Sequence, residues 1–165
     1  QEREEHTKAM FHNWSILDTG TVDYEDYFQE TLQMLPENLH AAAEAIFRDW
    51  YRLPYVPGIP ELIADLKKQG RSLYLLSNAP CYFSEKSGYF QQVLQFFDGI
   101  IFSADIKMVK PHPEIYQYLL KKFSLNPKDC PFIDDMPQNI AGAKQCGIDG
   151  FLFTGDVDVL RKKLS

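Results

Sequence analysis

Two adjacent carboxylates, Asp134 and Asp135, directly follow a short apolar run and precede a helix-like pattern that begins near Pro137. Buried parallel strands are typically continuous apolar runs, and ligands of open α/β sheets bind outside the carboxyl ends of such strands. Mg²⁺ takes oxygen ligands, often one or two carboxylates together with water and a substrate phosphate. The pair therefore predicts a Mg²⁺ site. The alternative is a solvated turn whose carboxylates cap the next helix.

Other polar side chains also follow short apolar runs, as Asp134 and Asp135 do. Ser77 and Asn78 follow the apolar run 73–76, and Lys110 lies in the loop after the apolar run 100–102. A hydroxyl, an amide and an ammonium suit a phosphoryl group, whose oxygens gain charge during transfer. Taken singly, Ser77 and Asn78 also fit a helix N-cap, and Lys110 also fits an ordinary surface lysine.

From residue 58 onward, expected helices alternate with expected strands, and these elements position the polar groups. Alternation of helices and strands predicts a parallel sheet with helices on both faces, and such a sheet brings all its carboxyl strand ends to one edge. The expected helices cover 59–69, 81–97, 113–123 and 138–146, with a short final one, and the expected strands cover 72–76, 100–102, 130–133 and 150–153.

Residues 1–53 have a different pattern, with helical spacing of apolar residues and no strand signal. One helix is expected to begin after Asp23 and to end before Pro36, which cannot continue it, and another is expected over 40–51. The sequence therefore predicts two domains, a helical one over residues 1–53 and an α/β one over residues 54–165.

Three separate motifs resemble the loop motifs of the haloacid dehalogenase (HAD) superfamily, in the family's order, over about residues 54–155. Within the family, the chain resembles the branch with a helical cap, especially sugar-phosphate phosphatases of the α-glucose-1-phosphate phosphatase type, and residues 1–53 resemble the cap. The resemblance implies a three-layer Rossmann-like parallel sheet. The motifs are Leu75–Asn78, Val109–Tyr116, and Phe132–Asp135 with Asn139, Ile140, Ala143, Gly147 and Ile148.

The resemblance also implies a role for each candidate residue in a Mg²⁺-dependent phosphatase that forms an aspartyl phosphate. Ser77 is expected to bind the transferring phosphoryl group, and Asn78 to lie beside it. Lys110 is expected to offset the negative charge of phosphate and nucleophile. Asp134 and Asp135 are expected to bind Mg²⁺ directly or through water, which favours phosphate chemistry over dehalogenation, and the expected substrate is a small phosphate ester, such as a sugar phosphate.

The family's first motif, a strand that ends in Asp-x-Asp and supplies the nucleophile, does not precede the cap in this sequence. Asp18, in Asp18–Thr21, resembles a phosphorylated aspartate loop, but it follows a poor strand and is expected in a turn between cap helices. We therefore expect a chain that lacks its natural N-terminus and is itself inactive. A missing central strand would leave unpaired sheet edges, through which the chain could associate with itself.

Aromatic residues of the cap are candidates for substrate selection, although aromatic side chains at helical spacing also fit a hydrophobic core. They are His12, Trp14, Tyr24, Tyr27 and Trp50.

The composition argues against a nucleic-acid-binding protein and against a membrane-spanning one. A formal net charge of −6 argues against a nucleic-acid partner, because phosphate contact favours a basic face. No apolar run is long enough to span a membrane and no secretory signal is visible, so a cytoplasmic location is expected.

Two other functions remain open besides a phosphatase. One is a non-catalytic protein of the same fold that serves as a binding or scaffold module. The other is a signalling domain like a response-regulator receiver, which also combines acids, a hydroxyl and a lysine. The order of these groups along the present chain, serine then lysine then acids, is the reverse of the receiver order and disfavours it.

Overall fold

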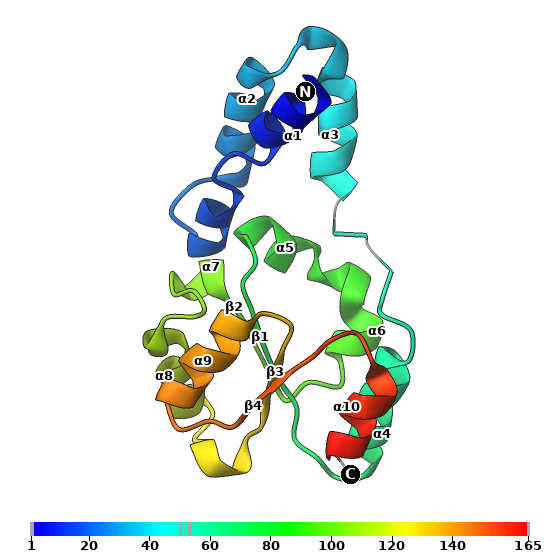
Figure 1. The fold of residues 1–165 in the computed structure, drawn as a ribbon, viewed down its shortest axis with the longest axis vertical. Coiled ribbons are helices and arrows are strands. Elements are labelled where there is room, and N and C mark those ends of the chain that lie inside the picture. The colour runs from blue at the N-terminus through cyan, green and yellow to red at the C-terminus, as the bar shows by residue number, and fades with distance from the viewer. Residues whose placement is uncertain (1, 50, 53, 165) are drawn as a thin grey trace.

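The N-terminal part of the chain is a group of helices that lies at one end of the computed structural model (Figure 1), which describes residues 2–49, 51–52 and 54–164. We call residues 2–49 the cap. Its elements are α1 (Glu2–Met10), η1 (Trp14–Thr19), α2 (Tyr24–Met34), η2 (Glu37–Leu39) and α3 (His40–Asp49).

Asp23 begins α2 because its side chain accepts hydrogen bonds from the backbone N–H groups of Glu25 and Asp26, which would otherwise lack partners. The helix ends before Pro36, as predicted.

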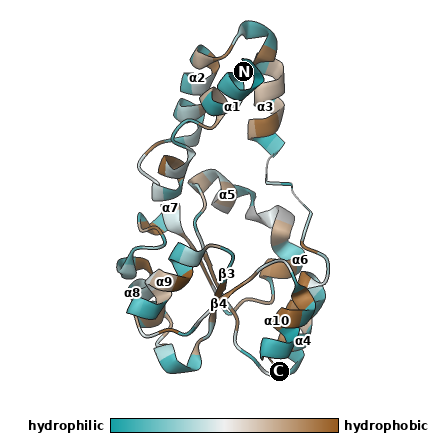
Figure 2. Ribbon diagram, viewed as in Figure 1, coloured by the Kyte–Doolittle hydropathy of each residue, from teal (hydrophilic) through white to brown (hydrophobic). Residues whose placement is uncertain are grey.

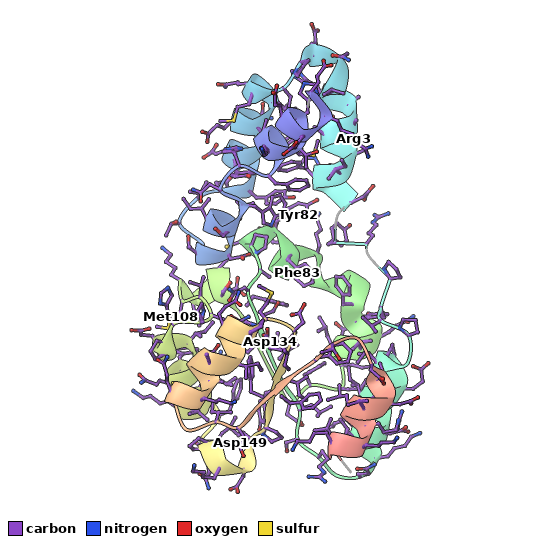
Figure 3. All side chains as sticks on the ribbon, in the orientation of Figure 1. Arg3, Tyr82, Phe83, Met108, Asp134 and Asp149 are labelled. Carbon is purple, nitrogen blue, oxygen red and sulfur yellow. The ribbon has the colours of Figure 1, made fainter. Side chains whose placement is uncertain are left out.

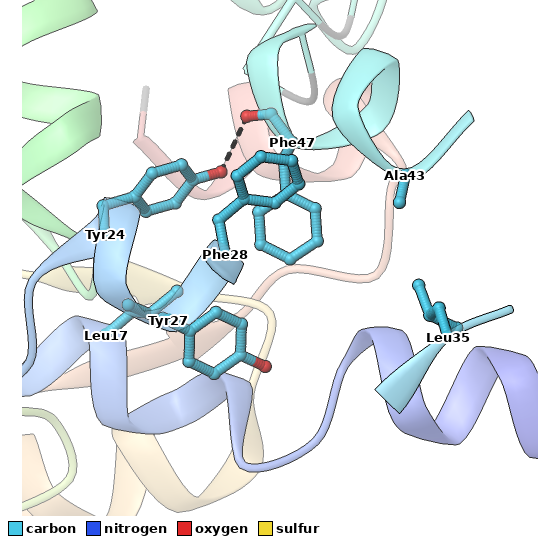
Figure 4. Packing of buried hydrophobic residues seen from close by; sticks show 7 residues of the cluster. All are labelled: Leu17, Tyr24, Tyr27, Phe28, Leu35, Ala43 and Phe47. Carbon is cyan, nitrogen blue, oxygen red and sulfur yellow. Dashed lines mark hydrogen bonds between the residues drawn. The ribbon is translucent and has the colours of Figure 1, made fainter. Parts of the chain in front are cut away.

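The cap has its own hydrophobic cluster, in which Tyr27 is 2% and Phe47 is 1% exposed. The Tyr24 hydroxyl donates a hydrogen bond to the Phe47 carbonyl oxygen at 2.7 Å (Figure 4). Trp14 packs against the cluster and His12 stacks on Tyr27. These aromatic candidates for substrate selection therefore contribute to the cap core. Trp50 lies outside the described residues.

The rest of the chain has the alternating order of helices and strands that the sequence predicts. In the described residues, the helix expected over 81–97 is divided by a 3₁₀ turn that contains Gly88, a poor helix former. The elements are α4 (Ile59–Lys68), β1 (Tyr74–Ser77), α5 (Cys81–Lys86), η3 (Ser87–Phe90), α6 (Gln91–Leu94), β2 (Gly99–Phe102), α7 (Ser103–Ile106), α8 (Pro113–Lys122), η4 (Pro127–Asp129), β3 (Phe132–Asp134), α9 (Pro137–Gln145), β4 (Gly150–Leu152) and α10 (Val157–Leu164).

The strands form two small parallel sheets rather than the single sheet that the alternation predicts. β1 pairs with β2, with Ser77 opposite Phe102, and β3 pairs with β4, with Asp134 opposite Leu152. Within the described residues, no ladder pairs a strand of one sheet with a strand of the other.

Helices cover both sides of the strands. Figure 1 shows α8 and α9 on one side and α4 and α10 on the other, and Figure 2 shows the apolar strands between them. Ile115 and Tyr116 of α8 and Ala143 of α9 are each 0% exposed, and they pack in one cluster with Leu76 of β1 and Ile101 of β2. Phe132 of β3 also packs against this cluster, so both sheets contact the same pair of helices although they share no ladder.

The cap lies beyond the carboxyl ends of β1 and β2, where α5 and α7 begin (Figure 1). Tyr82 of α5 stacks on Tyr24 of the cap, with ring centroids 4.3 Å apart, and its hydroxyl donates to the Arg48 carbonyl oxygen at 3.2 Å. The edge of the sheets at which the sequence predicts a site is therefore the edge that faces the cap.

None of the helices in the described part of the chain combines the length and the apolar character that crossing a bilayer requires.

Candidate functional site

Lys110 and Asp134 form an ion pair at the carboxyl ends of the strands. The Lys110 Nζ lies 2.6 Å from Asp134 Oδ2, and the two side chains are 9% and 6% exposed. The same Nζ donates a hydrogen bond to the carbonyl oxygen of Leu76 in β1 at 3.0 Å, and it lies 5.5 Å from the ring centroid of Phe132 in β3. Lys110 therefore connects the end of one sheet to the end of the other.

Asn78 fixes the loop that carries Lys110. Its Nδ2 donates to the Lys110 carbonyl oxygen at 2.9 Å, and its Oδ1 accepts a hydrogen bond from the Lys110 backbone N–H at 2.9 Å. This paired contact resembles a short ladder between two segments 32 positions apart. Asn78 is thus a positioning residue for Lys110, and its expected place beside a phosphoryl group stays a prediction.

The second oxygen of Asp134 is held by the start of the next helix, α9. Oδ1 accepts hydrogen bonds from the Met136 backbone N–H and from Asn139 Nδ2, each at 2.9 Å. The buried Tyr116 hydroxyl donates to the Asn139 carbonyl oxygen at 2.7 Å. Burial and then the nearby Asp134 charge raise the pKa of Tyr116, so its hydroxyl stays a donor. Figure 3 shows Asp134 between α9 and the strands.

Ser77 and Asp135 lie at this edge without contacts that fix them. Ser77 is half-buried at the end of β1, and Asp135 is exposed one residue beyond β3. In the described part of the chain, neither side chain has a recorded hydrogen bond or ion pair. The structure therefore brings Lys110 into contact with both Asn78 and Asp134, and it places Ser77 and Asp135 at the same edge, where their proposed roles stay predictions.

The segment around Asp18 reaches the same edge from the cap. The Asp18 carbonyl oxygen accepts a hydrogen bond from Ser103 Oγ at 2.6 Å, and the same oxygen atom of Ser103 accepts one from the Ala79 backbone N–H at 3.0 Å. Burial raises the pKa of the Asp18 carboxyl to about 6, and the Lys110 ammonium opposes this rise. The expected turn before α2 is present, and it contacts the core.

Two further residues belong to this site: Asn139, which the sequence placed in the third motif without a role, and Ser103, which was not a candidate from the sequence. Asn139 follows Asp134 by about one and a half helical turns. A polar residue at this spacing, in the first turn of the helix after a strand, can direct its side chain back to the end of that strand. Ser103 directly follows β2, as Ser77 ends β1, so the rule of polar groups at strand ends applies to it as well.

The side chains at the strand ends determine which kind of Mg²⁺ site this edge could form. Among the described residues, no group of three or more His, Cys, Asp or Glu side chains is arranged to hold a metal ion. Asp134 and Asp135 nevertheless offer oxygen donors, and Mg²⁺ often binds through one or two carboxylates while water and phosphate complete its shell. The donors fit a hydrated Mg²⁺ shared with a phosphate ligand, and they do not fit a site built from protein alone.

Sequence comparison finds relatives among phosphatases. The phosphoserine phosphatase of Thermus thermophilus is 27% identical over 128 residues, which cover 75% of this chain and 51% of that protein. Hexitol phosphatase B of Escherichia coli is 28% identical over 91 residues, which cover 55% of this chain and 41% of that protein. The chain thus spans about half the length, or less, of these curated relatives.

Structure comparison finds the same fold. A HAD family enzyme from Bacteroides thetaiotaomicron, solved in complex with magnesium and inorganic phosphate, has a TM-score of 0.70 at 21% identity and covers 96% of this chain and 90% of its own. A HAD-like family hydrolase from Porphyromonas gingivalis has a TM-score of 0.71 at 20% identity, with coverage of 98% and 90%.

The sequence profile of one family matches residues 9–153, which is most of the chain and includes both the cap and the strand-end residues. Its description is haloacid dehalogenase-like hydrolase, which agrees with the order of the three loop motifs. The protein therefore belongs to the haloacid dehalogenase-like hydrolase family.

Proposed function

We propose that this chain provides the cap and the accessory groups of a Mg²⁺-dependent phosphatase that hydrolyses small phosphate esters, in particular sugar phosphates. The observation that supports the proposal most is the enclosed pair of Lys110 and Asp134, 2.6 Å apart at the end of β3, in which Lys110 also contacts the Leu76 carbonyl oxygen of β1 at 3.0 Å. The phosphatase names of the sequence relatives agree with it. The whole protein's activity remains part of the proposal, because the chain spans only part of those relatives.

Ser77 and Lys110 are proposed to bind the phosphoryl group. The negative charge spreads over the equatorial oxygens during phosphoryl transfer, so a hydroxyl donor and an ammonium at that place stabilise the transition state. Asn78 keeps the Lys110 backbone in place through its two hydrogen bonds. The Lys110 side chain is then already ordered before a ligand arrives, which lowers the entropy lost on binding.

Asp134 and Asp135 are proposed to hold the Mg²⁺. When bound, the ion would supply positive charge to the phosphate oxygens and orient them. Asn139 and the Met136 backbone N–H fix the direction of the Asp134 carboxylate, because both donate to its Oδ1. Tyr116 supports Asn139 from the buried side of α9.

The attacking carboxylate is proposed to come from a further strand between β1 and β3, as the resemblance to the family implies. Such a strand would join the two small sheets and would end beside Lys110. Its carboxylate oxygen would attack phosphorus as the ester P–O bond breaks, and an acid two residues further on would give its proton to the departing alcohol. Water would then hydrolyse the aspartyl phosphate.

Phosphate release from glucose 1-phosphate and p-nitrophenyl phosphate tests the proposal. We expect almost no release by the chain alone, and Mg²⁺-dependent release once the chain is joined to a strand segment that ends in Asp-x-Asp. In the active form, Asp134→Ala should abolish release, and Asp158→Ala, an exposed change on α10, should not. Mg²⁺-stimulated release by Asp134→Ala would contradict the metal assignment, and persistent inactivity would favour a scaffold.

A further inference from the structure

Tyr116 of α8 is completely buried, and its ring is packed between a strand and a helix. The side chain is 0% exposed, and its ring meets Phe132 of β3 edge-on, with ring centroids 5.4 Å apart. On the side of α9 the fit is equally close, because a Cβ at Gly142 would lie 3.0 Å from Tyr116 Cε2. Protein interiors are close-packed, so a ring enclosed in this way is held in one position.

The hydroxyl of Tyr116 reaches the Asp134 carboxylate through one intervening residue. It donates a hydrogen bond to the Asn139 carbonyl oxygen at 2.7 Å, which fixes the first turn of α9. The Asn139 side chain then donates from Nδ2 to Asp134 Oδ1 at 2.9 Å. Asn139 is 7% exposed, so little water reaches it. The direction of the Asp134 carboxylate therefore depends on where Tyr116 holds Asn139.

The ring of Tyr116 reaches the other partner of the ion pair. Lys110 Nζ lies 5.5 Å from the ring centroid of Phe132, which is the ring that Tyr116 meets edge-on. A cation within about 6 Å of an aromatic centroid is attracted to the face of the ring. Tyr116 thus fixes Phe132, and Phe132 holds the ammonium that pairs with Asp134. One buried side chain supports both charges of the site.

We propose that Tyr116 is a positioning residue of the site, which orients Asp134 through its hydroxyl and Lys110 through its ring. The inference rests on the proposed function, which assigns these two charges to Mg²⁺ and to phosphate. Removing a residue that orients a metal-binding side chain typically weakens metal binding about 10- to 100-fold. The two contacts can be tested separately, because phenylalanine in place of Tyr116 removes the hydroxyl and keeps the ring.

Calorimetric titrations with Mg²⁺ and with inorganic phosphate test the hydroxyl contact. Tyr116→Phe should weaken Mg²⁺ binding in the presence of phosphate about tenfold. It should leave phosphate affinity without Mg²⁺ unchanged, because Lys110 keeps its contacts. Tyr118→Phe is the matched control, since it makes the same change on the same helix at a half-buried residue. In the described part of the chain, the Tyr118 hydroxyl has no recorded hydrogen bond.

Phe132→Leu tests the ring contact. It removes the aromatic face beside Lys110 and keeps an apolar side chain, so phosphate binding without Mg²⁺ should weaken about threefold. The factor by which Mg²⁺ strengthens phosphate binding should stay the same, because the hydroxyl contact is intact. Phe123→Leu is the matched control. Phe123 packs against the same hydrophobic cluster, and Lys122 Nζ lies 5.6 Å from its ring centroid.

Asn139→Ala shows whether the hydroxyl acts through Asn139. The single change should weaken Mg²⁺ binding at least as much as Tyr116→Phe does. The two changes together should weaken it no further than Asn139→Ala alone, because groups that act in series have non-additive effects. A purely structural role of Tyr116 would instead leave both affinities of the folded chain unchanged, or would alter them by the same factor.

The inference is overturned if Tyr116→Phe binds Mg²⁺ as tightly as the unaltered chain, if it weakens both affinities equally, or if its effect adds to that of Asn139→Ala. Should circular dichroism show that Tyr116→Phe does not fold, Asn139→Ala and Phe132→Leu decide. The first must lower Mg²⁺ affinity and the second phosphate affinity, and any other result overturns the inference. An unaltered chain that binds neither Mg²⁺ nor phosphate would instead overturn the proposed function, so the two failures are distinguishable.

Discussion

The Lys110–Asp134 ion pair is nearly enclosed, with side chains that are 9% and 6% exposed. Removing one partner of such a pair leaves a buried charge without compensation. We predict that Lys110→Met lowers the free energy of unfolding by about 3 kcal/mol. Urea denaturation followed by circular dichroism at neutral pH measures this change.

The exposed pair of Lys67 and Asp98 supplies the control, because its side chains are 29% and 39% exposed at a comparable distance of 2.8 Å. Lys67→Met should lower the free energy of unfolding by at most about 1 kcal/mol. Combining Lys110→Met with Asp134→Asn should recover part of the loss, because the unpaired charge is removed. Equal effects of the two lysine changes would mean that Lys110 is not the counter-charge described above.

Asp18 makes stability depend on pH, because burial raises its pKa from 3.8 to about 6. Between these values the folded chain binds more protons than the unfolded chain, so stability falls as the pH rises from about 4 through about 6. The shift corresponds to at most about 3 kcal/mol, which solvent screening of the half-buried group reduces to about 1 to 2 kcal/mol. Asp18→Asn should therefore stabilise the chain above pH 6 relative to the unaltered chain.

Urea denaturation at pH 4 and at pH 7 checks this prediction, with Asp26→Asn as an exposed control in the same domain. The stability difference between Asp18→Asn and the unaltered chain should grow by about 1 to 2 kcal/mol from the lower to the higher pH. A difference that does not change with pH would show that the Asp18 carboxyl is well solvated.

At the scale of elements, α9 sets the position of the Lys110 loop. Gly142 in α9 lies so close to the loop that a Cβ would overlap the Pro111 carbonyl oxygen. Gly142→Ala must therefore push α9 away from the residue that follows Lys110, and we expect a loss of about 1 to 3 kcal/mol despite the better helix propensity of alanine.

Thermal or urea unfolding measures the effect of Gly142→Ala, and Gly88→Ala is its control, because a Cβ at Gly88 meets nothing within 4 Å. Gly142→Ala should also weaken phosphate binding, since it displaces Lys110 relative to Asp134. A fully stable Gly142→Ala variant would contradict the close approach of α9 to this loop.

The meeting of Lys110 with Asp134 follows from the sequence because parallel strands place their carboxyl ends at one edge. Local patterns also predict α2, with Asp23 before it and Pro36 after it, and the order of helices and strands beyond residue 58. The contact between Ser103 and Asp18 joins residues 85 positions apart. No periodicity encodes such a contact, because it depends on how the cap docks on the core.

At the scale of the whole molecule, the strands form two separate ladders although one pair of helices packs on both. The apolar side chains of Ile133 and Leu152, which are 36% and 39% exposed, lie in the second ladder. Strand edges of this kind favour pairing with a further strand, whether from a joined segment or from a second copy of the chain. Self-association through these edges stays a prediction. A strand is the expected partner, because it can pair with the backbone groups that a strand edge leaves unpaired.

The central claim is that the strand ends bind Mg²⁺ and phosphate together through Asp134 and Lys110. Calorimetric titration of the chain with inorganic phosphate, with and without Mg²⁺, tests it most directly. We predict phosphate binding that Mg²⁺ strengthens at least about tenfold in the unaltered chain and in Asp158→Asn, since the ion offsets charge between the carboxylates and phosphate. Asp134→Asn should lose the Mg²⁺ effect, and Lys110→Met should weaken binding with or without Mg²⁺. Phosphate affinity that is the same with and without Mg²⁺, and the same in Asp134→Asn, would contradict the claim.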